Sequence, residues 1–408
     1  MTSDLTLGLS LSLSGKYAAM GRQAAAAIGL FVADLNAAGG IAVDGARRRV
    51  ALECFDDQSR ADRTREIYRE LCFTQRRDLI FGPYSSALAR AAAPLAEDAG
   101  LLMVNHGGAD DALHDHGNRM IVSVLSPASE YLVGFARLLA TLKFWRKRLA
   151  IAAANTPFAA TVAAGLERAT ETRRIWLHGV RLRMKYTGTF DRDRTPDLLV
   201  RALRRNRINA FVSVGGYDHD LAMMRLAAAE HLNIPVLGCV AAGVDRFGAD
   251  LGAAAEGIVG PSQWEPEFEV RPETGPSPAE FARRMRATAH VCDYPAAQIY
   301  AAGLLTAAAI RAAASHAPDR LRAAFADLRT TTLFGDFAIN RVTGQQLGHQ
   351  MLLVQWHEGG KHLIGHDGEI ADADLELPSG WRLLLASASR LMINRRGKPA
   401  PPPEEIDE

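Results

Sequence analysis

The sequence predicts an α/β protein with two doubly wound lobes, each built around a mainly parallel sheet. Short apolar runs alternate with helical segments, which is the pattern of parallel strands covered on both faces. The alternation ends near residue 122 and starts afresh near residue 148. At 408 residues the chain is also too long for one ordinary core. We therefore expect two lobes of similar architecture.

The first series of elements opens with a strand over 5–13 and an Ala-rich helix over 20–40 that ends at a glycine pair. A second strand is expected over 48–57 and a charged amphipathic helix over 60–73. The stretch 79–108 then reads LIFGPYSSALARAAAPLAEDAGLLMVNHGG. Its two apolar runs, LIFG and LLMV, predict the third and fourth strands, with one helix between them.

Small and polar residues follow the third and fourth strands where each strand ends. PYSS follows the first of these strands, and NHGG follows the second. The carboxyl ends of parallel strands meet at one edge of a sheet, and open α/β sheets bind small ligands there. The sequence therefore predicts a ligand-binding cleft at this edge.

The second series repeats the alternation with new strands and helices. Strands are expected at 148–155, 176–184, 210–216 and 235–240, and helices at 157–170, 195–206 and 219–231. Asp218 is expected to cap the last of these helices.

The rest of the chain is expected to cross between the lobes and to finish in antiparallel strands. Five of the 18 prolines lie within 261–278, which is typical of an ordered crossing followed by a loop. A helix is predicted over 296–314, and two strand-like runs joined by turns over 334–365. Residues 366–408 form a C-terminal extension, in which 380–393 predicts an amphipathic helix and the end of the chain a disordered tail.

The charge balance argues against partners recruited by a strong electrostatic field. Lys plus Arg number 47 against 46 Asp plus Glu, a formal net charge of +1. A field this weak attracts neither nucleic acid nor an anionic membrane, so neither is expected as a partner. No run of about 18 apolar residues occurs, so no membrane span is predicted.

The opening MTSDLTLGLSLSLSG lacks a basic segment and a long apolar segment, so it is not expected to be a signal peptide. The protein is therefore cytoplasmic, or it is periplasmic and its export signal was removed before this numbering begins.

The four cysteines are widely spaced and are expected to be buried free thiols. The alternative is a disulfide between Cys54 and Cys72, which the sequence does not decide.

No catalytic or nucleotide-binding motif occurs in the sequence, and no enzymatic activity, cofactor or metal is expected. Ser85, Ser86, His106 and Asp110 have the residue types of a catalytic triad. Small and polar residues at two strand ends need no catalysis to explain them, however. The segment DDALHDHGN (110–118) is expected to be a solvated loop rather than a metal site.

Together these pieces resemble the type I periplasmic binding proteins, and within them the leucine/isoleucine/valine-binding branch that serves ABC importers. The resemblance extends over residues 5–365. The matching pieces are, in order, LSGKYAAMGRQAAAAIGLFVADLNAAGGI, FDDQS, GPYSSA, GLLMVN, SVGGYD, GIVGPSQWEP and TLFGDFAINRVTGQQLGHQMLLVQW. Each piece is short, but their order and spacing are similar to those of the family.

The resemblance implies two Rossmann-like α/β lobes joined by a three-crossing hinge, with the ligand held between lobes that close on it. The first lobe would comprise 1–122 plus 262–340, and the second 123–261 plus 345–365. The remainder, after residue 365, would lie outside the family's fold.

The resemblance also implies where the ligand is held. Hydroxyl and backbone N–H groups at the ends of the third and fourth strands would grip a carboxylate, and aromatic or apolar side chains would contact the rest. Residues at the matching positions are Ser85, Ser86, Asn105, His106 and Gly107 for the carboxylate, Tyr17, Met20, Phe158 and Tyr217 for the side chain, and Asp218 for an ammonium. For some of these residues the alternative is a structural role. The serines would cap the helix, His106 would bond to a neighbouring carbonyl group, and Phe158 would pack in the core.

The chain departs from the family at one place. Amino-acid binders of this branch have an acid after a strand of the second lobe, where it pairs with the ligand's α-ammonium, whereas this sequence has Val240 and Ala241. A buried ammonium without an anionic partner is strongly disfavoured. Either Asp218 or Asp245 takes that role, or the ligand is a carboxylate without an amino group.

The resemblance thus implies a non-catalytic receptor for a small carboxylate, either an amino acid or an analogue. Such a receptor, monomeric or dimeric, presents its closed form to an ABC permease. The alternative is a ligand-responsive sensor or regulator of the same fold that binds an amide or an aromatic or aliphatic acid. The lack of a signal peptide and the extension after Gly365 favour this alternative.

Overall fold

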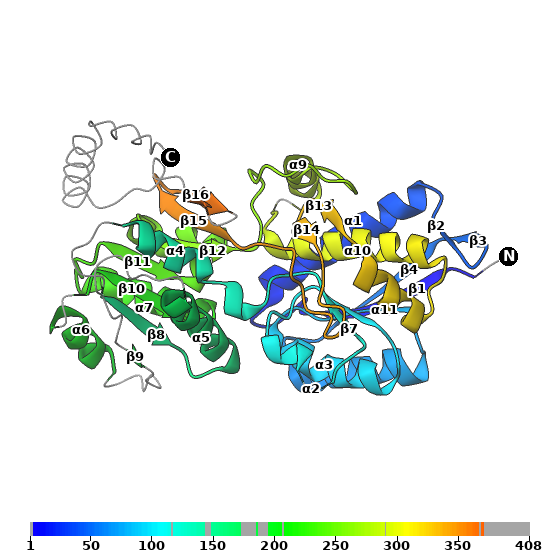
Figure 1. Cartoon of the computed structure of the whole chain (residues 1–408), viewed down its shortest axis with the longest axis horizontal. Coiled ribbons are helices and arrows are strands. Elements are labelled where there is room, and N and C mark those ends of the chain that lie inside the picture. Colours follow the sequence, from blue (N-terminus) through cyan, green and yellow to red (C-terminus); the bar gives the residue numbers. More distant parts are fainter. Residues whose placement is uncertain are drawn as a thin grey trace, which may run out of the picture.

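The computed structural model describes residues 3–115, 117–142, 148–172, 185–186, 195–205, 208–289, 291–366 and 369–370. Over these residues the chain forms two α/β lobes that lie end to end, each around its own sheet (Figure 1). The predicted fold class, with two doubly wound lobes, is confirmed.

The first lobe contains a five-stranded parallel sheet in the order β4-β1-β5-β6-β7. Its strands are β1 (Leu5–Leu11), β4 (Val50–Asp56), β5 (Leu79–Phe81), β6 (Met103–Asn105) and β7 (Ile121–Ser123). Alternate residues of β5 point to opposite faces, because side chains alternate along a strand. Leu79 and Phe81 join one hydrophobic cluster and Ile80 joins another, so both faces of this sheet are covered.

Helices α1 and α10 cover one face of this sheet, and α2 and α3 cover the other. The helices of this lobe are α1 (Ala18–Ala37), α2 (Ala61–Arg69), α3 (Ser86–Asp98), α9 (Pro278–Ala289), α10 (Tyr294–Ala313) and α11 (Pro318–Asp327). Shorter elements are a π-helical turn η1 (Glu70–Thr74), the 3₁₀ turn η2 (Asp111–His114) and the hairpins β2 (Ile41–Val43) with β3 (Ala46–Arg48) and β13 (Thr330–Thr332) with β14 (Gly335–Phe337).

Sequence features explain the end of α1 and the position of α10. Gly39 and Gly40 both have positive φ just beyond α1, so the predicted stop at a glycine pair is confirmed. Among the described residues, α10 is the one helix long and apolar enough to cross a membrane, by length and composition. Its most apolar window is 72% buried inside the protein, where α10 packs along α1 as a core helix.

The second lobe contains an eight-stranded mixed sheet in the order β17-β16-β15-β12-β11-β10-β8-β9. Its strands are β8 (Leu149–Ala153), β9 (Lys185–Tyr186), β10 (Ala210–Val214), β11 (Val236–Cys239), β12 (Val259–Ser262), β15 (Leu352–His357), β16 (Gly360–His366) and β17 (Glu369–Ile370). The first five are parallel, and the last three are antiparallel, as predicted for the end of the chain. Glu358 and Gly359 join β15 to β16 with positive φ at both positions, the geometry of a tight hairpin turn.

The second lobe's helices are α4 (Val133–Thr141), α5 (Pro157–Thr172), α6 (Thr195–Arg205), α7 (Tyr217–Ala229) and α8 (Arg246–Leu251), with 3₁₀ turns η3 (Ala128–Glu130), η4 (Val240–Gly243) and η5 (Gly252–Ala255). One prediction was wrong here, because α7 begins at Tyr217 with Gly216 as its cap. Asp218 therefore lies inside the first turn and is not the capping residue. The strand predicted at 176–184, the helix at 380–393 and the tail lie outside the described residues.

Three chain segments connect the lobes, and a hydrogen-bonded group of buried side chains ties them together. Ser126 follows β7, Gln263 follows β12, and His349 precedes β15. The backbone of Ser126 exchanges two hydrogen bonds of 3.2 Å with the Gln263 amide, and His349 Nε2 donates to the Gln263 carbonyl at 2.9 Å. We refer to these three residues as the hinge clasp.

We propose lobe boundaries of 1–122 plus 262–340 and 123–261 plus 345–365, because the clasp residues lie at or near each change of sheet. The sheet of the second lobe continues slightly further, since β17 pairs with β16 beyond residue 365.

The four cysteines are free thiols. Burial raises the pKa of Cys54 to about 11 and that of Cys72 to about 12, so both stay protonated at neutral pH.

Candidate functional site

A cavity of about 400 Å³ lies between the two lobes. Its wall from the first lobe comes from the start of α1 and the segment that leads into α10. Its wall from the second lobe comes from the turn between η4 and α8. The lining residues are Ala19, Met20, Arg22, Gln23, Val244, Asp245, Arg246, Ala289, Val291 and Asp293. Because both lobes contribute to the wall, a ligand here would touch both.

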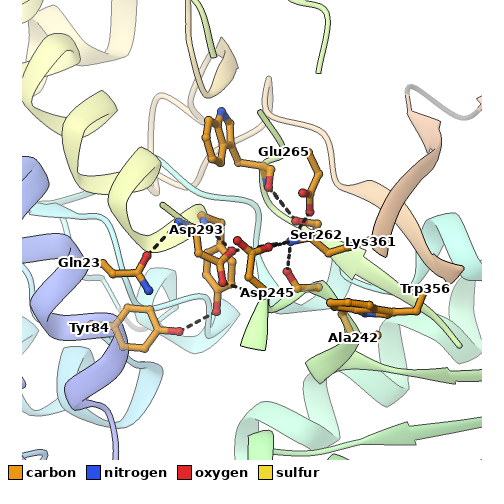
Figure 2. Close-up of polar contacts among 12 residues, drawn as sticks. Gln23, Tyr84, Ala242, Asp245, Ser262, Glu265, Asp293, Trp356 and Lys361 are labelled. Atoms are coloured by element: carbon orange, nitrogen blue, oxygen red, sulfur yellow. Dashed lines mark hydrogen bonds and ion pairs between the residues drawn. The ribbon is translucent and has the colours of Figure 1, made fainter. Parts of the chain in front are cut away.

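Four charged residues meet at one edge of this cavity, and we call them the acid–lysine cluster: Asp245, Glu265, Asp293 and Lys361. Lys361 Nζ lies 2.6 Å from Asp245 Oδ1, 2.8 Å from Glu265 Oε1 and 3.9 Å from Asp293 Oδ1. Figure 2 shows Lys361 on β16 reaching toward the acids, with Gln23 and Tyr84 on the opposite side. The cluster therefore joins the second lobe's sheet to the amino end of α10.

The surrounding backbone holds the cluster in place. Lys361 Nζ also donates to the Gly243 carbonyl at 2.9 Å. The neighbouring carbonyl of Ala242 accepts a 2.8 Å hydrogen bond from Trp356 Nε1, which fixes this turn against β15. On the other lobe, the N–H of Asp293 donates to Gln23 Oε1 at 2.9 Å. Each side of the cluster is thus anchored in its own lobe.

Burial and charge act in opposite directions in this cluster. Burial alone would lower the pKa of Lys361, but the three carboxylates outweigh it and hold that pKa well above its ordinary value. Burial raises the pKa of Glu265 to about 8 and that of Asp293 to about 6, although Lys361 opposes both shifts. Lys361 is therefore an ammonium at neutral pH, and burial makes both acids harder to ionise than usual.

Five aromatic side chains lie near the amino end of α10, outside the lining of the cavity. The Tyr84 hydroxyl contacts the Tyr294 hydroxyl at 2.7 Å, and the Tyr17 ring meets the Tyr84 ring edge to face at 6.1 Å. In the second lobe, Tyr131 meets Phe158 edge to face at 5.6 Å. Burial raises the pKa of Tyr131 to about 12. These five residues, which we call the aromatic group, provide an apolar surface with a few hydroxyls.

The predicted serines lie at the amino end of α3. Ser85 is the residue before the helix, and its hydroxyl accepts from the Leu88 N–H at 3.4 Å. Its φ is +102°, a strained value for a residue other than glycine. Ser86 is the first helical residue and is half-buried. The helix amino terminus carries partial positive charge, which favours an anion nearby.

The loop after β6 is tightly packed. Asn105 Oδ1 accepts from the N–H groups of Gly107 and Gly108, at 3.4 and 2.9 Å, and Asn105 Nδ2 donates to the Gly108 carbonyl and to Ser123. A Cβ on Gly107 would lie 2.6 Å from Tyr84 Cα. The resemblance implied that backbone N–H groups here would grip a carboxylate, but the N–H groups of both glycines donate to Asn105 Oδ1. The glycines serve close packing instead.

The residue types of a catalytic triad do not assemble. His106 is fully buried, and neither ring nitrogen makes a hydrogen bond. Burial lowers the pKa of His106 to about 3, so it stays neutral. Asp110 pairs with Arg90 and accepts from the Ala112 N–H. Neither serine hydroxyl is therefore activated by His106.

The 110–118 segment is only in part the solvated loop that we predicted, because Asp115 and Gly117 are exposed whereas Leu113 and His114 are buried. His114 is buried, with Nδ1 2.8 Å from the Thr343 carbonyl and Nε2 2.7 Å from Ser123 Oγ. It thus joins the first lobe to the third crossing. Within the described ranges, no group of three or more His, Cys, Asp or Glu side chains is arranged to hold a metal ion.

The remaining predicted residues lie on the second lobe, outside the lining of the cavity. The Tyr217 hydroxyl donates to Asp250 at 2.6 Å, and its ring lies under the Arg246 guanidinium at 3.8 Å. Asp218 is exposed. The buried acid of this helix is Asp220, which accepts from Ser213 and from the Ala241 N–H at 3.0 Å. Burial raises the pKa of Asp220 to about 7.

Of the residues that the sequence analysis offered for the site, Met20 and Asp245 line the cavity, and Tyr17 lies one turn before Met20. Sequence analysis missed Lys361, Glu265 and Asp293. A local pattern was available for Asp293, because an acid followed by Tyr-Pro is typical of a cap before a helix. Lys361 follows a Gly-Gly turn, and nothing nearby in the sequence indicates that it is buried.

Two α/β lobes, three crossings and a cavity walled by both lobes define a two-lobed solute-binding protein. The periplasmic binding protein family model matches residues 4–361, and the chain belongs to this family. Members of the family are binding proteins and are generally not catalysts.

Solved structures with the same fold bind different ligands. An ABC transporter substrate-binding protein from Desulfitobacterium hafniense in complex with Leu has a TM-score of 0.72 at 18% identity, over 88% of this chain and 100% of that one. A solute-binding protein from R. palustris in complex with benzoate has a TM-score of 0.72 at 17% identity, over 91% and 99%. A branched-chain amino acid transporter substrate-binding protein from Streptococcus pneumoniae in complex with isoleucine has a TM-score of 0.72 at 17% identity, over 92% and 100%.

Proposed function

We propose that the protein is a non-catalytic receptor that binds a small carboxylate between its lobes and presents it to an ABC-type importer in the periplasm. The observation that carries the proposal is the cavity of about 400 Å³ with walls from both lobes. A ligand that contacts both walls binds the closed arrangement better than an open one, and so favours closure. A membrane partner can then recognise the closed arrangement of the lobes.

A carboxylate is supported by the amino end of α3, which lies beside Tyr84 of the aromatic group and outside the lining of the cavity. The amino end of α3 carries Ser85 and Ser86, and hydrogen bonds to a charged group contribute about 1.5 to 3 kcal/mol each. The ligands named for the three similar structures, leucine, benzoate and isoleucine, all carry a carboxylate. The aromatic group would then contact the ligand's apolar part.

A thermal-shift panel tests the proposal. The panel contains branched, aromatic and polar amino acids, aliphatic and aromatic carboxylates, and short amides. A ligand at about 100 times its Kd adds about 2.7 kcal/mol, which raises the Tm by a few degrees in a chain of this size. If no carboxylate raises the Tm at millimolar concentration, the receptor proposal fails.

The double substitution Ser85→Ala and Ser86→Ala locates the carboxylate. We expect it to remove most of the ligand-induced shift while the unliganded Tm falls only slightly. Ser277→Ala is the matched control, because Ser277 Oγ likewise accepts from the Glu280 N–H at a helix start, and it precedes α9 at the end opposite to Ala289, which lines the cavity. An unchanged ligand shift in the double variant would place the carboxylate elsewhere.

A further inference from the structure

The charges around the cavity determine which ligands it can accept. A ligand ammonium buried between the lobes needs an anionic partner, since an unpaired buried charge is strongly disfavoured. The acids that line the cavity are Asp245 and Asp293. Whether the ligand carries an ammonium therefore depends on whether either acid is available.

Asp293 is fully engaged by the protein itself. Its Oδ1 accepts from the Tyr294 N–H at 2.7 Å, and its Oδ2 accepts from the Asp245 N–H at 3.0 Å. Its side chain is 2% exposed. A ligand could therefore reach the Asp293 carboxylate only by breaking the hydrogen bond that caps α10.

Asp245 already has an ammonium partner. Lys361 Nζ lies 2.6 Å from its Oδ1, the distance of a charge-assisted hydrogen bond. The Lys361 side chain is only 6% exposed, and Gly243 and Glu265 hold its ammonium from other directions. Lys361 is therefore a fixed, internal cation that neutralises Asp245 from one side, while the Asp245 side chain itself is 44% exposed.

Two further cations line the same cavity. Arg22 donates to the Leu13 carbonyl and, within the described part of the chain, has no carboxylate at ion-pair distance. Arg246 lies over the Tyr217 ring and 3.6 Å from the exposed Asp250. Their positive charge disfavours a second ammonium and attracts a carboxylate.

We propose that Lys361 determines specificity by taking the acid that a ligand ammonium would need, so that the receptor selects carboxylates without an amino group. This inference rests on the proposed receptor function and names its ligand class: a monocarboxylate with an apolar body that fits beside the aromatic group. Lys361 acts without touching the ligand's carboxylate.

Matched ligand pairs test this on the full chain by calorimetry at pH 7. Each pair differs only in the α-ammonium: 3-phenylpropanoate with phenylalanine, and 4-methylpentanoate with leucine. We expect the acid of at least one pair to bind about tenfold or more tightly than its amino acid. An amino acid that binds as tightly as its acid overturns the inference but leaves the receptor function standing. If neither member of either pair binds and the thermal-shift panel is also negative, the receptor function itself fails.

Two substitutions separate charge from packing. Lys361→Met keeps the apolar stem but removes the ammonium, and we expect the acid-to-amino-acid affinity ratio to fall by about tenfold or more as Asp245 becomes available. Lys361→Arg keeps the charge and is expected to keep the wild-type ratio. If Lys361→Met weakens both members of a pair equally, Lys361 is only structural and the inference is overturned. The comparison of matched ligand pairs uses only the wild-type protein, so it tests the inference even if the Lys361→Met variant does not fold.

Discussion

Ser126 Oγ lies 2.6 Å from Nδ1 of His349, although 223 residues separate them in the chain. His349 Nε2 donates to the Gln263 carbonyl, so Nδ1 is the acceptor in a neutral imidazole and the Ser126 hydroxyl donates to it. The His349 ring also stacks on Phe334 at 4.2 Å. One side chain thus connects all three crossings.

Removing the Ser126 hydroxyl should weaken the hinge clasp. Ser126→Ala leaves a buried ring nitrogen without its donor, and we expect the free energy of unfolding to fall by about 1 to 3 kcal/mol. Urea denaturation measures this. Thr161→Ala is the control, because it removes an exposed hydroxyl from α5 and should change stability by less than about 0.5 kcal/mol. Equal effects in the two variants would contradict the clasp.

The buried His349 should make the protein less stable in acid. Burial lowers its pKa to about 4, below the ordinary 6.5, so the folded state binds its proton less readily than the unfolded state does. Its contribution is fully present above pH 6.5 and is lost as the pH falls toward 4, a change of about 3 kcal/mol. Denaturation at pH 7 and pH 4 should show a smaller decrease for His349→Gln than for the wild type. The buried His106 and His114 affect both proteins alike, so an identical decrease would argue against this role.

Gly107 should tolerate no side chain. A Cβ there would lie 2.6 Å from Tyr84 Cα and 2.7 Å from the Pro83 carbonyl oxygen, both backbone atoms. We expect Gly107→Ala to lower the free energy of unfolding by about 1 to 3 kcal/mol. A Cβ on Gly29 in α1 would meet no atom within 4 Å, so Gly29→Ala should stabilise the protein by about 0.5 to 1 kcal/mol. Chemical denaturation of the two variants should therefore give changes of opposite sign.

The Tyr84–Tyr294 contact should be energetically coupled. A double-mutant cycle with Tyr84→Phe and Tyr294→Phe is expected to give a coupling energy of about 0.5 to 1.5 kcal/mol, because the two hydroxyls contact each other at 2.7 Å. Tyr300 is the control partner, since its hydroxyl donates to Asp34 instead. The Tyr84→Phe, Tyr300→Phe cycle should be additive within about 0.5 kcal/mol. A coupling energy as large in the control cycle would mean that Tyr84 is coupled to α10 in general and not through its contact with Tyr294.

Much of the fold could be predicted because its causes are local. The LIFG run contains β5, the LLMV run leads into β6, the glycine pair ends α1, and Glu358 and Gly359 form the turn between β15 and β16. Each of these depends on residues a few positions apart. Asp218 was misassigned as a helix cap for the same reason, since Gly216 and Asp218 both suit a helix start and only packing distinguishes them.

The site was less predictable, because its residues come from separate parts of the chain. Ser85, Ser86 and Met20 follow strand ends, where the topology itself indicates a cleft. Asn105 and Gly107 follow a strand end too, but their mutual hydrogen bonds depend on how the loop meets Tyr84. The same residue types would suit an open anion site or a packed loop, and the sequence alone does not distinguish the two.

By itself the sequence determined the two α/β lobes, the order of their strands and helices, and the family, since periodic burial and turn residues act over a few positions. Only the tertiary structure decided which charges meet. Lys361 contacts Asp245, Glu265 and Asp293 because two lobes and an antiparallel strand bring these residues together from distant parts of the chain. Electrostatic interactions depend on distance in space and on burial, and neither is encoded in the spacing of residues along the chain.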